Sequence, residues 1–328
     1  MIESNENENK NQALLNALNQ KVDVIRSEVQ KVIIGQHEVI ELFLVALFTG
    51  GHILLEGVPG IAKTLLARMV AKTISSDFSR IQFTPDLMPT DILGTSIFDM
   101  KDSKFEFKPG PIFSNIVLID EINRSPAKTQ AALFEVMEER QISVDGVTYK
   151  MEEPFMVLAT QNPIEHEGTY KLPEAQLDRF LFKIKVTYPS LEDEKLILKR
   201  FSQDFNSKVT QEVKPVLKPA DIKKISALME SVHIKDDLID YIAEIVNKTR
   251  YAGELYLGAS PRASLAILKA SKAIACLRGR DFVTPEDIQF VSNPVLNHRV
   301  ILTAEKEMEG AEVEDVIEEI VQSLDVPR

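Results

Sequence analysis

Residues 57–64, with the sequence GVPGIAKT, have the composition of a phosphate-binding loop. A glycine-rich turn follows an apolar run and leads through Lys63 and Thr64 into a segment with helical character. Backbone N–H groups of such a turn point at one spot and carry partial positive charge, which suits phosphate oxygens. Lys63 adds a full positive charge near the β and γ phosphates, and the Thr64 hydroxyl is a potential Mg²⁺ ligand.

The predicted nucleotide contacts are the whole loop and the residue after it: Gly57, Val58, Pro59, Gly60, Ile61, Ala62, Lys63, Thr64 and Leu65. The strict motif has Gly directly before the lysine, where this chain has Ala62. We expect Ala62 to open the following helix, where its small side chain leaves room for phosphate. The alternative is a simple turn before an ordinary helix with an exposed lysine.

Two adjacent carboxylates, Asp120 and Glu121, directly follow the apolar run 116–119. Ligands of open α/β sheets bind just outside the carboxyl ends of the strands. We therefore predict that Asp120 holds Mg²⁺, directly or through water, and that Glu121 polarises an attacking water. The alternative is a loop that carries two solvated acids.

Three further polar residues stand at the ends of predicted elements. Asn162 follows the apolar run 155–159, where an amide could orient water or contact the γ-phosphate. Arg179 precedes the run 180–184, and Arg262 lies in the first turn of a helix expected after Ser260. A cation in a first turn opposes the helix dipole, which favours an anion facing Arg262. The alternatives are an Asn-Pro turn and surface arginines paired with nearby acids.

The elements that must position these residues change character along the chain. Continuous apolar runs at 53–55, 116–119, 155–159 and 180–184 fit strands buried on both faces of a parallel α/β sheet. After Ser190 amphipathic helices dominate, and Thr284 and Ser260 mark two well-signalled helix starts. We expect a disordered polar N-terminus, an α/β nucleotide-binding domain and a smaller helical domain, over 1–12, 13–189 and 190–328.

Composition limits the binding partners and the cellular compartment that are expected for the chain. The chain has 328 residues and a net charge of -12, which argues against nucleic-acid affinity over the whole surface and leaves room for a local basic patch. The single Cys276 cannot form an internal disulfide, which fits a reducing compartment such as the cytoplasm. We expect no signal peptide and no membrane span, because polar residues and glycines break the longest apolar stretch, 39–55.

Five motifs in order make the chain resemble the AAA+ ATPases, and most of all their MoxR branch. The resemblance covers about residues 32–294, and Ala before the lysine is usual in this branch. The motifs are GVPGIAKT at 57–64, IDEINR at 119–124, ATQNP at 159–163, LPEAQLDRF at 172–180 and GASPRA at 258–263. The resemblance implies a P-loop AAA+ fold, in which helices sandwich a parallel sheet and a small all-α lid domain follows.

The resemblance also assigns roles. Lys63 and Thr64 resemble the Walker A pair, and Asp120 and Glu121 the Walker B pair. Asn162 resembles sensor 1, while the lid residue Arg262 resembles sensor 2. Arg179 resembles the arginine finger, which acts on ATP held by the neighbouring subunit, and Arg124 is a second candidate for work across that interface. The adenine-contacting segment is matched by Ile34, Gly35 and Gln36.

The implied function is Mg²⁺-dependent ATP hydrolysis in a homo-oligomeric ring, expected to be a hexamer, with chaperone-like remodelling or maturation of a partner protein. Family partners often carry a von Willebrand A domain, and metal-cofactor insertion recurs among their roles. Residues 98–107 resemble an insertion in the second helix, and 142–149 form a predicted β-hairpin with an Asp-Gly turn. An ATP-dependent DNA motor, a nucleotide switch without turnover and a small-molecule kinase remain as alternatives.

Overall fold

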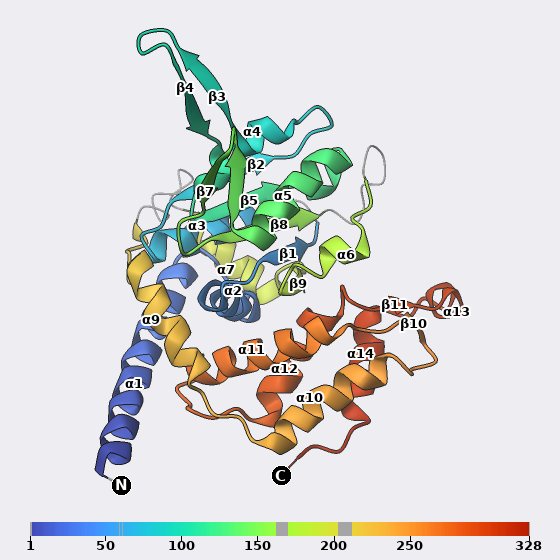
Figure 1. Ribbon diagram of the computed structural model, residues 1–328. Coiled ribbons are helices and arrows are strands. Elements are labelled where there is room, and N and C mark those ends of the chain that lie inside the picture. The colour runs from blue at the N-terminus through green and yellow to red at the C-terminus, as the bar shows by residue number, and fades with distance from the viewer. Residues whose placement is uncertain (1, 59, 61, 162–169, 203–211, 328) are drawn as a thin grey trace.

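A computed structural model describes residues 2–58, 60, 62–161, 170–202 and 212–327, with side chains from residue 13 onward. Its centre is a five-stranded parallel sheet in the order β2-β5-β8-β1-β9 (Figure 1). The strands span, in that order, Phe78–Gln82, Ile116–Asp120, Met156–Gln161, Ile53–Glu56 and Phe182–Lys185. The prediction of a parallel α/β sheet is confirmed, and the edge strand β2 is an addition to the predicted strands.

Successive strand residues point to opposite faces of the sheet, and each face has its own apolar core. Ile116 and Leu118 pack toward α2 (His37–Thr49) and α3 (Lys63–Thr73). Val117 and Ile119 pack toward the other side, where the core includes Leu133 of α5 (Ala127–Glu139). Because both faces are covered, the central strands consist of continuous apolar runs. On this second side also lie the short α4 (Pro89–Leu93) and the 3-10 turns Pro111–Phe113 and Ile122–Arg124.

The rest of the domain structure is mainly helical. The bounds of its helices are α6 Glu174–Leu177 before β9, then α7 Leu191–Phe201, α9 Pro219–Glu230, α10 Asp236–Thr249, α11 Pro261–Leu277, α12 Pro285–Leu296, α13 Ala304–Met308 and α14 Val313–Gln322. Of these, α10, α11, α12 and α14 lie below the sheet in Figure 1. A small antiparallel pair, β10 (Leu255–Leu257) and β11 (Ile301–Leu302), joins them. We propose the domain boundary near Ser190, where the sheet has ended and the helical region begins. The core is nevertheless continuous, since residues of α10–α12 and of α2 belong to one apolar cluster.

The N-terminal region differs from the expectation of a disordered segment over 1–12, because α1 runs from Ile2 to Gln30. Leu15, Leu18, Val22 and Ile25 recur at helical spacing and are buried. Once these turns are fixed by packing, each further residue is added to the helix at low cost, since nucleation is the expensive step. The helix therefore extends into the polar N-terminal residues.

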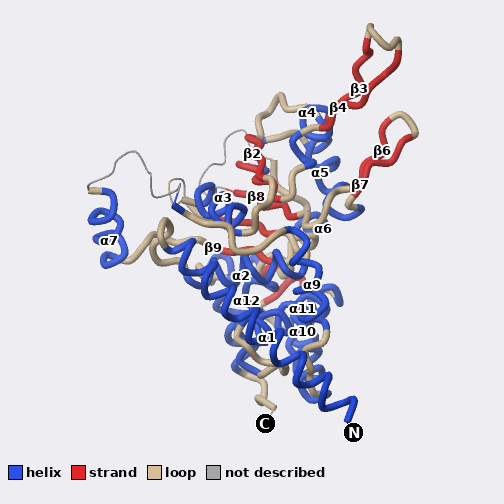
Figure 2. The backbone as a smooth tube through the Cα atoms, turned by 90° about the vertical axis from the view of Figure 1, so that its left-hand side faces the viewer, coloured by secondary structure: helices blue, strands red, loops and turns tan. Residues whose placement is uncertain are grey.

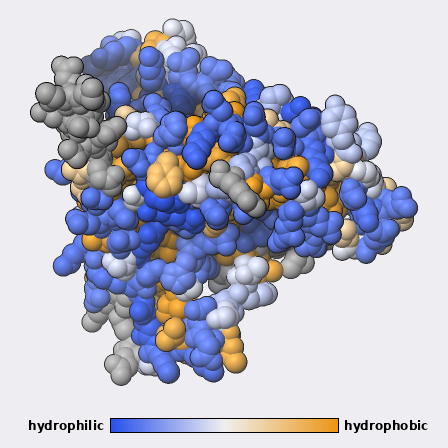
Figure 3. Space-filling model, turned by 90° about the horizontal axis from the view of Figure 1, so that it is seen from below, coloured by the Kyte–Doolittle hydropathy of each residue, from blue (hydrophilic) through white to orange (hydrophobic). Residues whose placement is uncertain are grey.

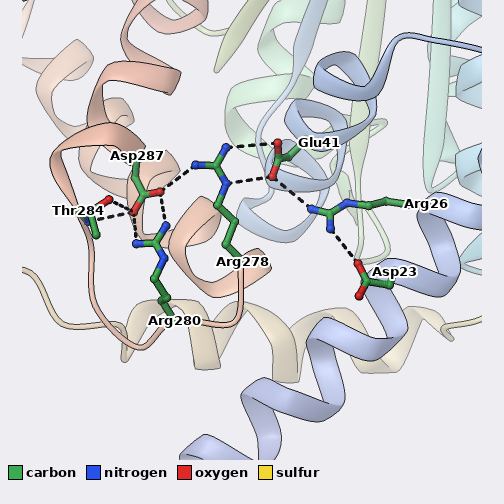
Figure 4. Close-up of polar contacts among 7 residues, drawn as sticks. All are labelled: Asp23, Arg26, Glu41, Arg278, Arg280, Thr284 and Asp287. Atoms are coloured by element: carbon green, nitrogen blue, oxygen red, sulfur yellow. Dashed lines mark hydrogen bonds and ion pairs between the residues drawn. The ribbon is translucent and has the colours of Figure 1, made fainter.

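Ion pairs connect α1, α2 and the helical region in one chain of contacts (Figure 4). Glu41 of α2 accepts hydrogen bonds from Arg26 of α1 at 3.2 Å and from Arg278 at 3.3 Å. Arg278 also donates to Asp287 in the first turn of α12, at 3.2 Å. Arg280 donates two more bonds to Asp287, at 2.6 and 2.7 Å, and this hydrogen bonding raises the pKa of Arg280. The buried carboxylate of Asp287 thus fixes the turn between α11 and α12.

Replacing Asp287 with Asn is expected to lower the free energy of unfolding by about 2 kcal/mol, because Arg280 would lose its charged partner and Arg278 would keep only Glu41. Asp287 also accepts a bond from the backbone N–H of Thr284, which completes the predicted helix start. The measurement is denaturant unfolding followed by circular dichroism. Asp236→Asn, at an exposed first-turn aspartate of α10, is the matched control and should change the free energy by less than about 0.5 kcal/mol. Equal effects of both substitutions would contradict a structural role for the Asp287 cluster.

Two antiparallel hairpins project from the sheet on the same side (Figure 2). The longer one pairs β3 (Gly94–Asp99) with β4 (Lys104–Pro109), and the shorter pairs β6 (Gln141–Val144) with β7 (Val147–Lys150). The shorter hairpin has the predicted Asp-Gly turn, in which both central residues have positive φ, 51° and 78°. The hairpins touch through the rings of Phe107 and Tyr149, whose centroids are 4.4 Å apart.

The helix in the longest apolar stretch and the single cysteine are both buried. Among the described residues, no helix combines the length and the apolar character needed to span a bilayer. The apolar stretch that contains α2 is instead buried inside the protein. Seen from below, the molecular surface is mainly hydrophilic with scattered hydrophobic residues (Figure 3). Cys276 is buried, and burial raises the pKa of its thiol to about 12, so this thiol is unsuited to catalysis.

Candidate active site

The phosphate loop lies where the chain order of the sheet reverses. After β1 the chain crosses to the far edge to form β2, while β8 and β9 flank β1. Such a switch point leaves a crevice at the carboxyl ends of the strands. There the structure has a cavity of about 370 Å³. Its lining consists of Gly60, Ala62, Lys63, Thr64, Leu65, Arg80, Gln82, Asp120, Glu121 and Thr160.

The end of the loop differs in one respect from the sequence expectation. Ala62 does not open the helix: it precedes α3 with a left-handed backbone, φ 62° and ψ 21°, and Lys63 is the first helical residue. A left-handed conformation costs a residue with a Cβ atom about 1–2 kcal/mol relative to the right-handed one. The glycine of the strict motif is therefore explained by backbone conformation as well as by space for phosphate.

Lys63 points back toward the loop. Its ammonium donates a 2.6 Å hydrogen bond to the carbonyl oxygen of Gly57. Partial burial lowers the pKa of Lys63, and the nearby charges of Asp120, Glu121 and Glu56 act against this decrease. The lysine and the two predicted catalytic acids are thus close enough to interact electrostatically, as their proposed roles require.

Both acids are held by polar neighbours. Asp120 accepts a 2.5 Å bond from Nε of Arg80 through one oxygen and a 3.3 Å bond from the Thr160 hydroxyl through the other. Glu121 has a left-handed backbone with φ 57°, and its N–H donates to the Thr160 hydroxyl at 3.0 Å. Its carboxylate accepts a 2.8 Å bond from Gln82 and lies 3.1 Å from Nε of Arg124. Strained backbone held by side-chain bonds is a common feature of active sites.

Sequence reasoning missed three residues of this cavity: Arg80, Gln82 and Thr160. Arg80 and Gln82 lie on β2, which was not recognised because its residues are not a continuous apolar run. The alternation of Arg80 and Gln82 with the apolar Ile81 and Phe83 was the available signal. Thr160 was part of the polar segment that follows the apolar run 155–159 and lies within β8, and its link to both acids required the pairing of β5 with β8.

The site suits Mg²⁺ by the chemistry of its donors. The Thr64 hydroxyl and the Asp120 carboxylate line the same cavity, and Mg²⁺ prefers such hard oxygen ligands. Within the described part of the chain, no three His, Cys, Asp or Glu side chains form a metal-binding cluster. Mg²⁺ usually takes one or two protein ligands together with substrate phosphates and water.

A second, larger cavity of about 600 Å³ lies between α2, β9 and α12. The predicted adenine segment, Ile34, Gly35 and Gln36, lines it. Gly35 has φ 71°, and a Cβ there would lie 3.0 Å from a carboxylate oxygen of Asp193, so both backbone and space favour glycine. The volume is within the usual range for small-molecule sites, about 300–1,000 Å³.

The structure does not bring Arg179 or Arg262 to either cavity lining. Instead both approach Glu138 of α5: Nε of Arg179 lies 3.7 Å from its carboxylate, and a terminal nitrogen of Arg262 lies 3.9 Å away. Arg262 is also 3.7 Å from Asp178, which in turn binds Arg299 at 2.7 Å. Of the other predicted residues, Pro59, Ile61 and Asn162 lie outside the described residues.

Comparisons with known proteins agree with an α/β nucleotide-binding domain that is followed by a helical domain. Residues 52–182 match the model of the ATPase family associated with various cellular activities (AAA), and residues 247–320 match the AAA lid domain. The Mycobacterium tuberculosis protein named Chaperone MoxR1 is 45% identical over 310 residues, which cover 92% of this chain and 81% of that protein. Protein MoxR of Methylorubrum extorquens is 30% identical, over 92% of this chain and 93% of that protein.

The chain belongs to the MoxR family of AAA+ ATPases. The uncharacterized Bacillus subtilis protein YeaC is 47% identical over 91% of this chain and 92% of its own. A protein from Cytophaga hutchinsonii whose crystal structure is known is 43% identical in sequence. The two structures superpose with a TM-score of 0.90, and the match covers 100% of both chains. The MoxR resemblance drawn from the motifs and the predicted fold class are both confirmed.

Proposed function

We propose that this MoxR-family protein hydrolyses ATP with Mg²⁺ and uses the reaction to remodel a partner protein. The observation that carries the proposal is one cavity, lined by Lys63 and Thr64 at the start of α3 and by Asp120 and Glu121 at the end of β5. These are a cation for phosphate, two oxygen ligands for a metal, and a carboxylate for proton transfer. Together they supply the parts that phosphoryl transfer to water needs.

Each residue has a distinct task in this proposal. The loop N–H groups and Lys63 bind the phosphates, and Thr64 and Asp120 hold Mg²⁺. Bound Mg²⁺ neutralises phosphate charge as it develops in the transition state. Glu121 orients the attacking water and accepts its proton, in a position fixed by Gln82 and Arg124. Asn162 is proposed to contact the γ-phosphate, and Ile34, Gly35 and Gln36 to contact the adenine.

A neighbouring subunit is proposed to complete the site. Arg179 and Arg262 lie together at Glu138 and line neither cavity of their own chain. Two cations that share one acid are suited to meet a phosphate anion brought by another subunit. A ring, with six subunits as the working model, would place one such pair at each interface. Arg262 is thereby proposed to act together with Arg179 rather than on the nucleotide of its own chain.

The hairpins are proposed to contact the partner. Large apolar side chains are exposed on them: Ile97, Phe98, Met100, Phe105 and Val147. Exposed apolar residues concentrated on projecting elements are typical of protein-binding surfaces. A relative named Chaperone MoxR1 supports a protein-directed role, and a partner with a von Willebrand A domain or a metal cofactor to insert fits the family. Because ATP is the proposed substrate, we propose a cytoplasmic location.

The test is phosphate release from Mg-ATP over a range of protein concentrations. Specific activity is expected to rise roughly tenfold or more from a dilute to a concentrated sample, because each site needs residues from two subunits. Analytical ultracentrifugation on the same samples should show assembly over the same range. Activity per chain that is constant while the protein changes from monomer to oligomer would contradict the shared site.

Other outcomes would favour the alternatives. Stimulation by DNA that falls steeply with salt would indicate a DNA motor, against which the net charge of -12 argues. Tight ATP binding without phosphate release at any concentration would indicate a nucleotide switch. Phosphate transfer to an added small molecule instead of water would indicate a kinase.

A further inference from the structure

Strand β2 presents two long polar side chains to the acids at the end of β5. Arg80 and Gln82 are two residues apart and therefore lie on the same face of the strand. In the sheet Gln82 is paired with Asp120, and Arg80 with Leu118. Arg80 contacts Asp120, whereas Gln82 contacts Glu121. From β2, the proposed metal ligand thus receives a cation and the proposed base a neutral amide, while the cation beside Glu121 is Arg124 from outside the strand.

The difference in charge matters for metal binding. The side chain of Asp120 is only 11% exposed, so its charge needs a nearby partner, and Arg80 provides one at 2.5 Å. A cation coordinated by the same carboxylate would have to compete with the guanidinium for it. Arg80 can withdraw, because its own side chain is 54% exposed on an edge strand. Gln82 carries no charge and would not compete in this way.

We propose that Arg80 is a displaceable counter-ion of Asp120, which Mg²⁺ must replace when it binds with ATP. The proposal rests on the proposed role of Asp120 as a metal ligand. Arg80 then raises the Mg²⁺ concentration that the site requires, and it keeps the carboxylate neutralised and in place at lower concentrations. It is a positioning residue, since it acts on the reaction only through Asp120.

The test measures binding, so it does not depend on turnover. A fluorescent, non-hydrolysable ATP analogue is titrated with Mg²⁺, and the Mg²⁺ concentration at half-maximal binding is determined for the parent and for Arg80→Ala. We expect that concentration to be lower in Arg80→Ala by roughly three- to tenfold, the range for losing one competing charge in a partly exposed pair. Arg80→Lys keeps the charge and should shift it less.

A control and a second readout separate this effect from general ones. Lys108→Ala removes a cation of β4 whose side chain is as exposed as that of Arg80, at 54%, and should leave the Mg²⁺ requirement unchanged. With Mg²⁺ alone and no nucleotide, the melting temperature of Arg80→Ala should rise more than that of the parent. Arg80→Ala and Lys108→Ala are first compared with the parent by circular dichroism. If Arg80→Ala fails to fold, Arg80→Gln takes its place.

Two results would overturn the inference. An unchanged or increased Mg²⁺ requirement in Arg80→Ala, with the parent binding the analogue normally, would show that Arg80 does not compete with the metal. That result leaves the proposed ATPase function intact. Failure of the parent itself to bind the analogue at saturating Mg²⁺ would instead reject the proposed function, and this inference with it.

Discussion

Replacing Glu121 with Gln is expected to slow phosphate release at least about 10²-fold and to leave ATP binding within about twofold of the parent, because a positioned base contributes 10²–10⁴-fold to a rate. Gln has the same shape as Glu and keeps a side-chain oxygen that can accept the bond from Gln82, so the cavity should retain its geometry. It has lost the capacity to take a proton from water and the charge that faces Arg124. Lys63, Thr64 and Asp120, which carry the proposed phosphate and metal contacts, are unchanged.

The measurement combines single-turnover phosphate release with a binding titration on the same preparation. Glu135→Gln, at an exposed position of the neighbouring helix α5, removes the same charge outside the cavity and should leave both quantities unchanged. If Glu121→Gln hydrolysed ATP at the parental rate, another group would have to act as the base. Loss of binding together with hydrolysis would instead indicate that Glu121 supports the structure of the nucleotide site.

The parts of the site that sequence reasoning found have strong local signals. β1, β5 and β8 are buried on both faces, so each is a continuous apolar run, and a glycine-rich turn or a polar cluster directly follows it. Since the carboxyl ends of parallel strands lie at one edge of the sheet, Lys63, Asp120 and Glu121 could be placed together without coordinates. The parallel α/β class followed from the same runs, whereas the AAA+ fold with its lid domain was implied by the resemblance of the motifs.

The partners of these residues could not be found in this way. Arg80 and Gln82 lie on an edge strand that is partly exposed, where the apolar pattern is weak. Their contacts with Asp120 and Glu121 depend on which strand is adjacent to β5 and in which register. The contacting residues are 40 and 39 positions apart, and nothing in the local sequence indicates that the two strands pair. The contact between Glu41 and Arg278, which are 237 positions apart, also arises only from the tertiary fold and could not be predicted from the sequence.

The ends of helices are also difficult to locate from the sequence. The acidic C-terminal segment from Ala304 has the apolar spacing of one amphipathic helix, whereas the structure has α13 and α14 with a break between them. Gly310, with φ 77°, lies in that break. The same spacing does identify the buried face of α14, since Val316, Ile317 and Ile320 are buried. Periodicity identifies which side chains face the core, but it continues across a short interruption and so does not locate it.

The proposed assignment of Arg179 to a neighbouring subunit leads to the second large effect. Arg179→Ala is expected to reduce the hydrolysis rate by about 10³-fold, the low end of the range for an arginine that stabilises phosphoryl transfer from another subunit. ATP binding should be nearly unaffected, since Arg179 lines neither cavity of its own chain. Lys306→Ala, which removes a cation paired with one acid on α13, is the control and should remain fully active.

Mixing two inactive variants decides whether the site is shared. In a ring assembled at random from equal amounts of Glu121→Gln and Arg179→Ala chains, about a quarter of the interfaces join an intact Glu121 to an intact Arg179, so about a quarter of parental activity should return. Mixing Arg179→Ala with a chain that carries both substitutions should restore nothing, because no interface then has an intact Arg179. If Arg179 acted within its own chain, neither mixture could regain activity. Recovery in the first mixture alone therefore requires a neighbouring subunit to supply the arginine.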